Sequence, residues 1–374
     1  MRHAAPRPAT LLILYVTLLA ALGVWLVLDP PISPGPLQQA AVDIMLGPGA
    51  IPTEPAPKPK SKPRPPEPTA PEPAAAPEPE ATETPRVATP SGTPKPLEIN
   101  LPPVKPGPKL ATAPDPGLVR RGRDGPLPVI SPDGRAAWRV YARPFDRADK
   151  RPRIAIVLHG LGINRDITKV AIAGLPGAVT LAISPYAKRL GQWVREARSA
   201  GHEVLLDVPM EPKKFFQIDA GPQALMASLE PAENIRRLEW VLSRATGYVG
   251  LINTLGMRFA SARRHLRPVM EALKSRGLLY LDTVPNSVVS QVARTVDIPW
   301  AAGEITVDQI MSREAIDKQL DALEKQARRA GRVVGLANPY AVTIGSVAWW
   351  ITGLEAKGIA LAPVSAVIFR KQDR

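Results

Sequence analysis

The most constraining feature of the sequence is a regular alternation of short apolar runs and amphipathic stretches in its C-terminal part. The apolar runs have the length of buried strands, and the stretches between them repeat their apolar residues with helical spacing. Such alternation predicts a parallel sheet, either open or closed into a (β/α) barrel. The predicted strands are 154–158, 178–183, 203–208, 248–252, 278–281, 299–302, 333–336 and 359–363. The predicted helices are 166–174, 188–200, 231–245, 263–276, 312–330 and 343–357.

The part of the chain before this pattern has the composition of a tether rather than of a globule. Between residues 30 and 116 lie 27 of the 45 prolines of the 374-residue chain, interleaved with Ala, Glu and Lys. This composition buries too little apolar surface to offset the entropy lost on folding. We therefore predict a disordered Pro-rich linker over 29–117 and a folded domain over 118–374.

Residues 9–28 contain no charged side chain and predict a transmembrane helix. At a rise of ~1.5 Å per residue this stretch reaches roughly 30 Å, which spans a bilayer core. Arg2 and Arg7 precede it without any acidic residue, so the positive-inside rule places the tail 1–8 in the cytoplasm. The sequence thus predicts a single-pass inner-membrane protein with a periplasmic C-terminal domain. A cleavable signal peptide is the alternative, which the long apolar stretch and the following Asp-Pro-Pro disfavour.

The overall composition excludes several classes of function. Cysteine is absent, which excludes disulfides and thiolate metal sites. The formal net charge of +14 is typical of proteins that bind nucleic acid, but the chain has no helix-turn-helix or aromatic-interleaved basic motif. We predict no nucleic-acid partner, because a basic surface suits an anionic envelope polymer equally well.

Polar residues follow the C-terminal ends of five predicted strands. In a parallel sheet or barrel these ends meet at one rim, where α/β proteins place their sites. A single polar residue at a strand end is often a helix cap, but five of them favour one functional pocket. The residues are His159, then Asp207 with Glu211, then Asn253, Asp282 and Asn338.

The motif "LHGLG" at residues 158–162 is also found in other folds with different roles. The oxyanion loop of an α/β-hydrolase would need a Gly-x-Ser-x-Gly elbow and a final catalytic His, and the last His of this chain is His265, inside a predicted helix. A dinucleotide-binding loop would need a third Gly. Of the remaining histidines we expect His202 in a surface turn and His265 on a solvated helix face.

From about Pro126 to Ser365 the sequence resembles the divergent polysaccharide deacetylase family of bacteria. The motifs that carry the resemblance are "DGRAAWRVYARPF", "RIAIVLHGLG", "GHEVLLDVPMEP", "GMRFASARRHLRPVMEALKSRGLLYLDT" and "ANPYAVT". The resemblance implies an envelope protein with a deformed (β/α) barrel, related to the metal-dependent carbohydrate-esterase deacetylases. It also implies an active-site cleft at the rim, in which Asp282, Glu211 and Asn253 match the family pattern.

Most of the other active-site positions depart from that pattern. The family shows Asp-Asp at His159-Gly160, His at Asp207, Asn-His at Asn253-Thr254 and Gly-His-Pro at residues 337–339. The deacetylases that the chain resembles hold a divalent ion, usually zinc, with an Asp as base and a His as acid. A catalytic zinc takes three protein ligands, mostly imidazoles, whereas this rim offers one imidazole.

These departures predict a degenerate member that binds glycan or a protein partner in the old cleft, with zinc only if the site is functional. The alternative is an active carbohydrate deacetylase that cleaves amide C–N bonds or O-acetyl esters of envelope glycan with an altered metal site. The candidate catalytic residues are His159, Asp207 and Asp282; the candidate substrate-binding residues are Glu211, Asn253, Arg258 and Asn338; metal ligands are not assigned.

One pair of departures keeps an Asp and a His at the rim, but at exchanged positions. The family's Asp and His at the ends of the first and third strands are exchanged here for His159 and Asp207. Such an exchange predicts an Asp–His pair across the barrel mouth, in which the carboxylate raises the pKa of His159.

Overall fold

The computed structural model describes residues 99–369, apart from 105–106, 109 and 215–216. The predicted membrane helix at 9–28 and most of the predicted linker lie outside the described residues. Within the described part of the chain, no helix is both long and apolar enough to cross a membrane.

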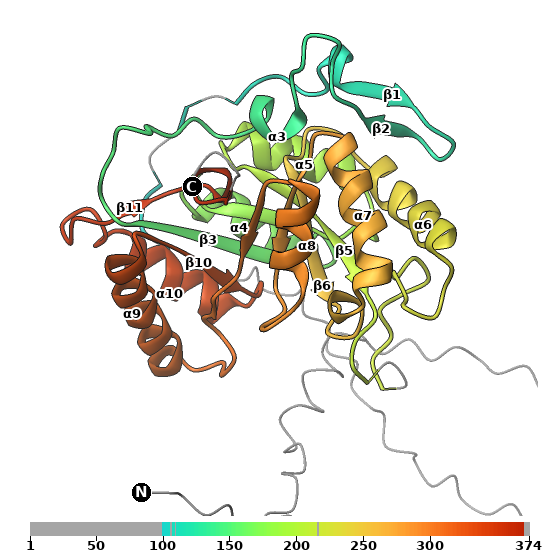
Figure 1. The fold of residues 1–374 in the computed structure, drawn as a ribbon. Coiled ribbons are helices and arrows are strands. Elements are labelled where there is room, and N and C mark those ends of the chain that lie inside the picture. Colours follow the sequence, from blue (N-terminus) through green and yellow to red (C-terminus); the bar gives the residue numbers. More distant parts are fainter. Residues whose placement is uncertain (1–98, 105–106, 109, 215–216, 370–374) are drawn as a thin grey trace, which may run out of the picture. The chain divides into compact units, whose positions relative to one another are not determined.

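The core of the domain is one sheet in which every pair of neighbouring strands runs parallel (Figure 1). The strand order is β8-β7-β6-β5-β4-β3-β10-β9, and β11 pairs with the beginning of β3. Every residue of β4, β5 and β7 is buried, which explains their continuous apolar runs. The bounds are β3 Arg153–Leu161, β4 Thr180–Ile183, β5 Val204–Met210, β6 Gly250–Leu255, β7 Leu279–Asp282, β8 Trp300–Ala302, β9 Ile305–Thr306, β10 Arg332–Ala337 and β11 Ala360–Leu361.

A single segment of chain joins the two edges of this sheet. Its first half, β8, pairs with β7, and its second half, β9, pairs with β10. Between the two, Gly303 donates to the Asp282 carbonyl and Glu304 donates to the Val334 carbonyl. The sheet is therefore strongly curved, and the architecture is an α/β half-barrel of parallel strands, as the alternation of strands and helices predicted.

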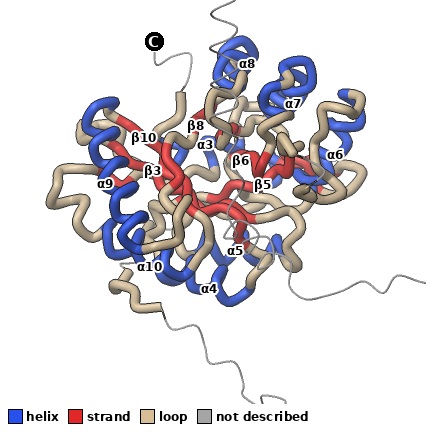
Figure 2. Tube along the Cα trace, turned by 90° about the horizontal axis from the view of Figure 1, so that it is seen from below, coloured by secondary structure: helices blue, strands red, loops and turns tan. Residues whose placement is uncertain are grey.

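The helices lie on the outside of the curved sheet, as Figure 2 shows. Most of them begin after the C-terminal end of one strand and return the chain to the N-terminal end of the next, as parallel pairing requires. The bounds are α3 Ala137–Val140, α4 Arg165–Gly174, α5 Leu190–Ser199, α6 Pro231–Ser243, α7 Arg263–Ser275, α8 Val289–Val296, α9 Arg313–Ala330 and α10 Ala341–Ile351.

All eight predicted strands are present, and the sequence analysis missed five elements of the domain: β9, α8, the two strands of a small hairpin, and the short helix α3 in the lead-in. The strand β9 has only two residues, and the helix α8 is rich in β-branched residues, which obscured its helical pattern. A small hairpin, β1 (Val119–Arg121) with β2 (Pro126–Pro128), lies in the lead-in that was predicted only as extended. The predicted helix 343–357 was too long at its C-terminal end, because α10 stops at Ile351.

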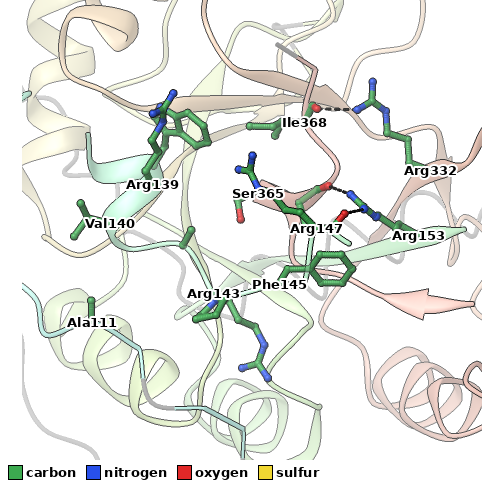
Figure 3. A pocket seen from close by; sticks show the side chains of 14 residues that line it. Ala111, Arg139, Val140, Arg143, Phe145, Arg147, Arg153, Arg332, Ser365 and Ile368 are labelled. Carbon is green, nitrogen blue, oxygen red and sulfur yellow. Dashed lines mark hydrogen bonds between the residues drawn. The ribbon is translucent and has the colours of Figure 1, made fainter. Parts of the chain in front are cut away.

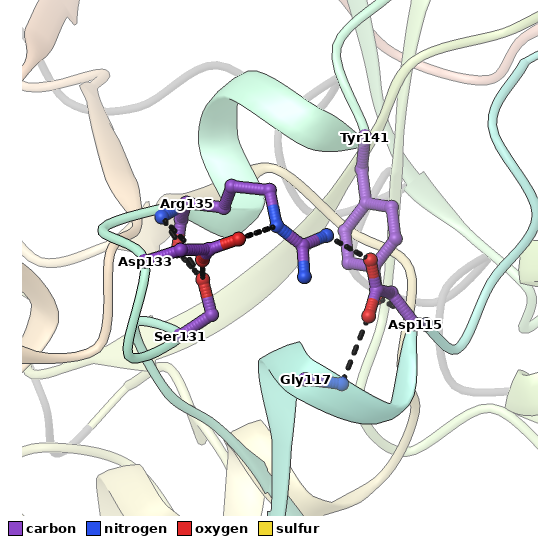
Figure 4. A network of polar contacts seen from close by, with 6 residues as sticks. All are labelled: Asp115, Gly117, Ser131, Asp133, Arg135 and Tyr141. Atoms are coloured by element: carbon purple, nitrogen blue, oxygen red, sulfur yellow. Dashed lines mark hydrogen bonds and ion pairs between the residues drawn. The ribbon is translucent and has the colours of Figure 1, made fainter.

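The chain before the hairpin is bound to the domain by polar contacts (Figure 4). Asp115 pairs with Arg135, and its backbone N–H donates to the Tyr141 hydroxyl at 2.8 Å. Further back, the Ala111 carbonyl accepts from the buried Arg198 guanidinium at 2.5 Å. Residues 111–117 thus satisfy donors that belong to the folded domain.

We expect removal of these residues to destabilise the domain. A chain that begins at Leu118 loses one of the three carbonyl acceptors of Arg198, and Arg135 and Tyr141 lose their partner Asp115, so its free energy of unfolding should fall by about 2 kcal/mol. For a domain of this size that loss lowers Tm by roughly 4–8 °C relative to a chain that begins at Ile99, as measured by circular dichroism. Equal melting temperatures would show that the segment 99–117 adds nothing to stability.

Candidate functional site

The candidate residues lie at one end of the sheet, where the C-terminal ends of the parallel strands meet. His159 is in the last part of β3, and Asp207 is in β5, two strands away. The others follow in strand order: Asn338 directly after β10, Glu211 directly after β5, Asn253 in β6 and Asp282 at the end of β7. The structure therefore groups these residues at one rim, and their contacts define what each of them does.

The Asp207 side chain in β5 reaches past β4 and binds the last part of β3. Its Oδ2 accepts from the Gly160 N–H at 3.0 Å, while its Oδ1 has no partner among the described residues. The side chain is 3% exposed, and burial raises the pKa of Asp207 to about 7, opposed by the hydrogen bond from the Gly160 N–H. Asp207 is thus a buried carboxyl group that is protonated in a large fraction of molecules near neutral pH.

The backbone amides of the "HGLG" loop are used inside the fold. Gly160 donates to Asp207, and Gly162 donates to the Thr168 hydroxyl at 2.9 Å. Both glycines have positive φ, and a Cβ on Gly162 would lie 2.6 Å from the Ala187 Cβ. These two glycines are therefore required by the loop geometry, and their amides do not form an oxyanion hole.

The expected ion pair between His159 and Asp207 is not formed. No hydrogen bond joins the two side chains, and burial lowers the pKa of His159 to about 4. The prediction of a raised pKa was wrong because desolvation dominates, and because a carboxyl group with its own raised pKa carries little charge to stabilise an imidazolium. Around pH 6 both side chains are predominantly neutral.

Glu211 and Arg258 form an ion pair that fastens the loop after β5 to the end of β6. Arg258 Nε lies 3.3 Å from Glu211 Oε1, and the Ala227 N–H donates to Glu211 Oε2 at 2.6 Å. The Glu211 carbonyl also accepts from the backbone N–H groups of Arg258 and Phe259. The Glu211 carboxylate is therefore buried and engaged in holding two loops together.

Asn253 and Asp282 likewise bind neighbouring loops. Asn253 exchanges hydrogen bonds with Thr283, at 2.7 Å to its hydroxyl and 2.9 Å from its backbone N–H, and donates to the Leu255 carbonyl. Asp282 accepts from the Val284 N–H at 3.0 Å and from the Ser287 hydroxyl, while burial raises the pKa of its carboxyl group.

Asn338 is held by a buried acid that the sequence analysis missed, Asp308. Asp308 accepts from the Asn338 backbone N–H at 2.8 Å, from its side-chain amide at 2.9 Å and from the Thr343 hydroxyl at 2.9 Å. The signal was present in the sequence, because "ITVD" repeats the pattern of an apolar run ending in Asp seen in "LLYLD" and "EVLLD". It was overlooked because the strand before it, β9, is so short.

Two other histidines differ from expectation. His202 is buried, not in a surface turn: its ring nitrogens lie 2.8 Å and 3.1 Å from the carbonyls of Val179 and Ile172. His265 is partly buried at the start of α7, and its Nδ1 is a buried atom without a hydrogen-bond partner among the described residues. His202 therefore stabilises the packing of α4 beside β4 rather than any site at the rim.

The rim does not fit the zinc of the metal-dependent deacetylases. Among the described residues there is no group of three His, Cys, Asp or Glu side chains that could hold a metal ion. Glu211 and Asp282 bind neighbouring groups of the fold, and Asp207 is buried. A catalytic zinc needs three protein ligands and an open position, so the side chains present do not supply this chemistry.

Comparison with known proteins identifies the family. The family model of the divergent polysaccharide deacetylases matches residues 156–368. The chain belongs to this family. The match begins in β3 and ends before the last described residue, so it contains the whole rim.

Three similar proteins carry names that call them uncharacterized. The Escherichia coli (strain K12) protein YibQ is 24% identical over 194 residues, which cover 51% of this chain and 60% of that protein. A Haemophilus influenzae protein is 25% identical over 197 residues, covering 51% of this chain and 68% of that protein. The crystal structure of an uncharacterized protein from Agrobacterium tumefaciens C58 is 35% identical with a TM-score of 0.63, covering 65% of this chain and 99% of that one.

Proposed function

We propose that this domain is a non-catalytic member of the divergent polysaccharide deacetylase family and binds a partner at the rim of its half-barrel. The observation that carries the proposal is that the rim side chains are engaged in contacts within the fold. Glu211, Asn253 and Asp282 bind neighbouring loops, and Asn338 is fixed by Asp308. What is left of the old active-site positions is a buried carboxyl group and an imidazole that are predominantly neutral around pH 6.

The surface around the rim favours a protein partner over a glycan. The described residues expose eight large hydrophobic side chains, and six of them lie at or after the C-terminal ends of strands. Exposed aliphatic side chains grouped in this way are typical of protein interaction sites, and none of the six is aromatic. We call these residues the apolar rim: Ile163, Ile218, Leu255, Met257, Ile310 and Met311.

Site-specific crosslinking tests this proposal. A photoreactive amino acid placed at Ile163, Met257 or Ile310 should crosslink to the same protein in cells, and the same group at Ile130, which is exposed outside the rim, should not. In a chain that carries the photoreactive group at Met257, the added substitution Ile310→Asp should remove the crosslink. Crosslinks from Ile130 alone would refute the proposal, and binding of purified envelope glycan that depends on Met257 would assign the rim to glycan instead.

A carbohydrate hydrolase is the second candidate, favoured by the raised pKa of Asp207. A carboxyl group with a pKa of about 7 is suited to proton transfer, and such groups are frequent in active sites. This candidate predicts that the purified chain releases acetate or cleaves envelope glycan, and that Asp207→Asn lowers the rate at least a hundredfold. If parent and Asp207→Asn chains both leave acetylated glycan unchanged, with or without added zinc, nickel or manganese, the hydrolase is excluded.

We propose that the domain acts in the cell envelope, tethered to the inner membrane by residues 9–28. The support is the sequence: an uncharged stretch long enough for a bilayer, two preceding arginines and a long Pro-rich linker. The chain would then carry its half-barrel on the periplasmic side, where it would contribute to envelope carbohydrate metabolism.

This topology predicts the behaviour of a reporter fused after Arg374. Alkaline phosphatase, which needs the periplasm to form its disulfides, should be active there, and a cytoplasmic reporter at the same position should be inactive. Substitution of Arg2 and Arg7 by Glu should reduce the phosphatase signal, because it removes the charge bias that orients the helix. The reverse pattern of reporter activity would place the domain in the cytoplasm.

A further inference from the structure

One residue of the apolar rim has a backbone conformation that its side chain disfavours. Leu255, the last residue of β6, has a φ of 61°, in the left-handed region. There the Cβ lies close to the following carbonyl oxygen, so Gly adopts this region freely, and Asn and Asp adopt it more readily than Leu does. Four described residues other than Gly have a positive φ, and Leu255 is the only aliphatic one; the others are Arg189, Asn286 and Asp297. The conformation of Leu255 therefore costs free energy of folding.

Packing does not offset this cost. The Leu255 side chain is 37% exposed, and within the described part of the chain it belongs neither to the hydrophobic core nor to the half-buried residues that pack against the core. Burial of aliphatic surface is the main favourable term in folding, and an exposed Leu contributes less of it than a core residue. The residue at this position is therefore not the one that folding of the isolated domain favours, which would be Gly or Asn.

Hydrogen bonds on both sides of Leu255 hold its turn in place. On one side the Asn253 side-chain amide donates to the Leu255 carbonyl at 2.9 Å, and Asn253 itself is fixed by its hydrogen bonds with Thr283. On the other side the backbone N–H of Arg258 donates to the Glu211 carbonyl at 3.2 Å. Strained conformations persist where the surrounding structure determines them, and they are frequent at functional sites. The turn is therefore rigid, and it presents Leu255 in one fixed position.

Exposed cations border this turn. Lys213 and Lys214 lie in the loop after β5, to which the turn is hydrogen-bonded, and Arg264 lies at the start of α7. None of the three forms an ion pair with a described residue. Asp219, an exposed acid in the same loop as the lysines, balances one of the three charges. A complementary surface would therefore be apolar opposite Leu255 and acidic at its edge.

Arginines at the opposite end of the sheet are bound within the fold. The cavity in Figure 3 lies beside the N-terminal ends of β3 and β10. There Arg153 donates to the Ala366 carbonyl at 3.3 Å, and Arg332 donates to the Ile368 carbonyl at 2.9 Å. The side chain whose placement folding does not explain lies at the rim instead.

We propose that Leu255 is the anchor residue with which the rim binds its protein partner, and that the partner receives it in an apolar pocket edged by Asp or Glu. A rigid turn loses little conformational freedom on binding, so the strained backbone pre-organises the side chain for its pocket. The exposed, flexible side chain of Met257, two residues further on, adapts to the wall of that pocket. This inference rests on the proposed function, because it needs a protein partner at the rim.

Four variants separate the anchor from the fold. Leu255→Gly removes both the side chain and the strain, so it should raise Tm by about 2–4 °C while it abolishes binding. Leu255→Met keeps a long apolar side chain and should bind as the parent chain does. Lys213→Glu with Lys214→Glu, at exposed positions, reverses the charge at the edge. Ile130→Gly is the matched control, because Ile130 is 43% exposed, lies outside the rim and has no positive φ; it should lower Tm and leave binding unchanged.

The measurement combines circular-dichroism melts of the purified chain with photocrosslinking of the full 374-residue chain in cells, from a photoreactive group at Ile310. We expect the crosslink to be at least tenfold weaker in Leu255→Gly, at least threefold weaker in the double lysine variant, and within about twofold of the parent in Leu255→Met and Ile130→Gly. If Leu255→Gly lowers Tm as Ile130→Gly does, or if Leu255→Gly or the lysine variant keeps the parental crosslink, the proposal is wrong although the rim still binds a protein. If no rim position of the parent chain gives a crosslink, the proposed function fails and this inference fails with it.

Discussion

Replacing Asp207 by Asn should stabilise the domain above neutral pH and leave its stability unchanged near pH 4. The carboxyl group has its pKa raised from 3.8 to about 7 by burial, so the folded state holds a proton that the unfolded state releases. A raised pKa of this kind contributes stability that is present below the unfolded pKa and is lost as the pH rises through the folded pKa. At pH 8 the lost contribution amounts to about 4 kcal/mol, because each pH unit between the unfolded and folded pKa values is worth roughly 1.4 kcal/mol.

The same titration in His159→Gln should show the opposite slope. The pKa of His159 is lowered from 6.5 to about 4, so its contribution is present above the unfolded pKa and is lost as the pH falls through the folded one. In the parent chain the two contributions oppose each other between about pH 4 and 6.5. Each single substitution should therefore reveal the slope that the other residue produces.

Denaturant melts from pH 4 to pH 8 measure both effects as differences from the parent chain. Asp317→Asn, at an exposed position of α9, is the matched control and should follow the parent at every pH. An Asp207→Asn chain whose stability parallels the parent across this range would mean that the Asp207 carboxyl group titrates normally and that the rim is hydrated.

Replacing Asp308 by Ala should be among the most destabilising single changes at the rim. Asp308 is 3% exposed and accepts three hydrogen bonds, two from Asn338 and one from Thr343. Its removal leaves three donors without an acceptor in a buried position, at a cost of about 3–5 kcal/mol in the free energy of unfolding. For a domain of this size the loss lowers Tm by roughly 6–20 °C.

Asp308→Asn keeps the shape of the side chain but removes its negative charge. The amide keeps an acceptor oxygen but adds donors where Asn338 and Thr343 already donate, so we expect a loss about half as large as with Ala. Asp317→Ala is the surface control and should change stability by less than about 0.5 kcal/mol. A loss below about 1 kcal/mol in Asp308→Ala would show that water replaces the carboxylate and that Asn338 is not fixed by it.

The architecture could be predicted from the sequence because apolar periodicity depends on local physics. A strand buried on both faces needs a continuous apolar run, and a helix covering it needs an apolar stripe. The residue pattern alone therefore predicts β3 and α9. The two-residue β9 is too short to be predicted as a strand from its apolar residues. It exists because the chain between β8 and α9 passes the edge of β10, and only the curvature of the whole sheet brings that edge within reach.

The sequence by itself determined which residues reach the rim, because the direction of parallel strands fixes which end each residue occupies. The tertiary structure decided which groups those side chains contact and which of them are charged. Whether Asp282 faces a ligand or the Ser287 hydroxyl, and whether Asp207 is charged, depends on loops that come from distant parts of the chain. Contacts between distant parts of the chain were also beyond the sequence: only the pairing of β3 with β10 places Arg153 beside Arg332. Desolvation and charge proximity are properties of packing, and no local pattern of residues encodes them.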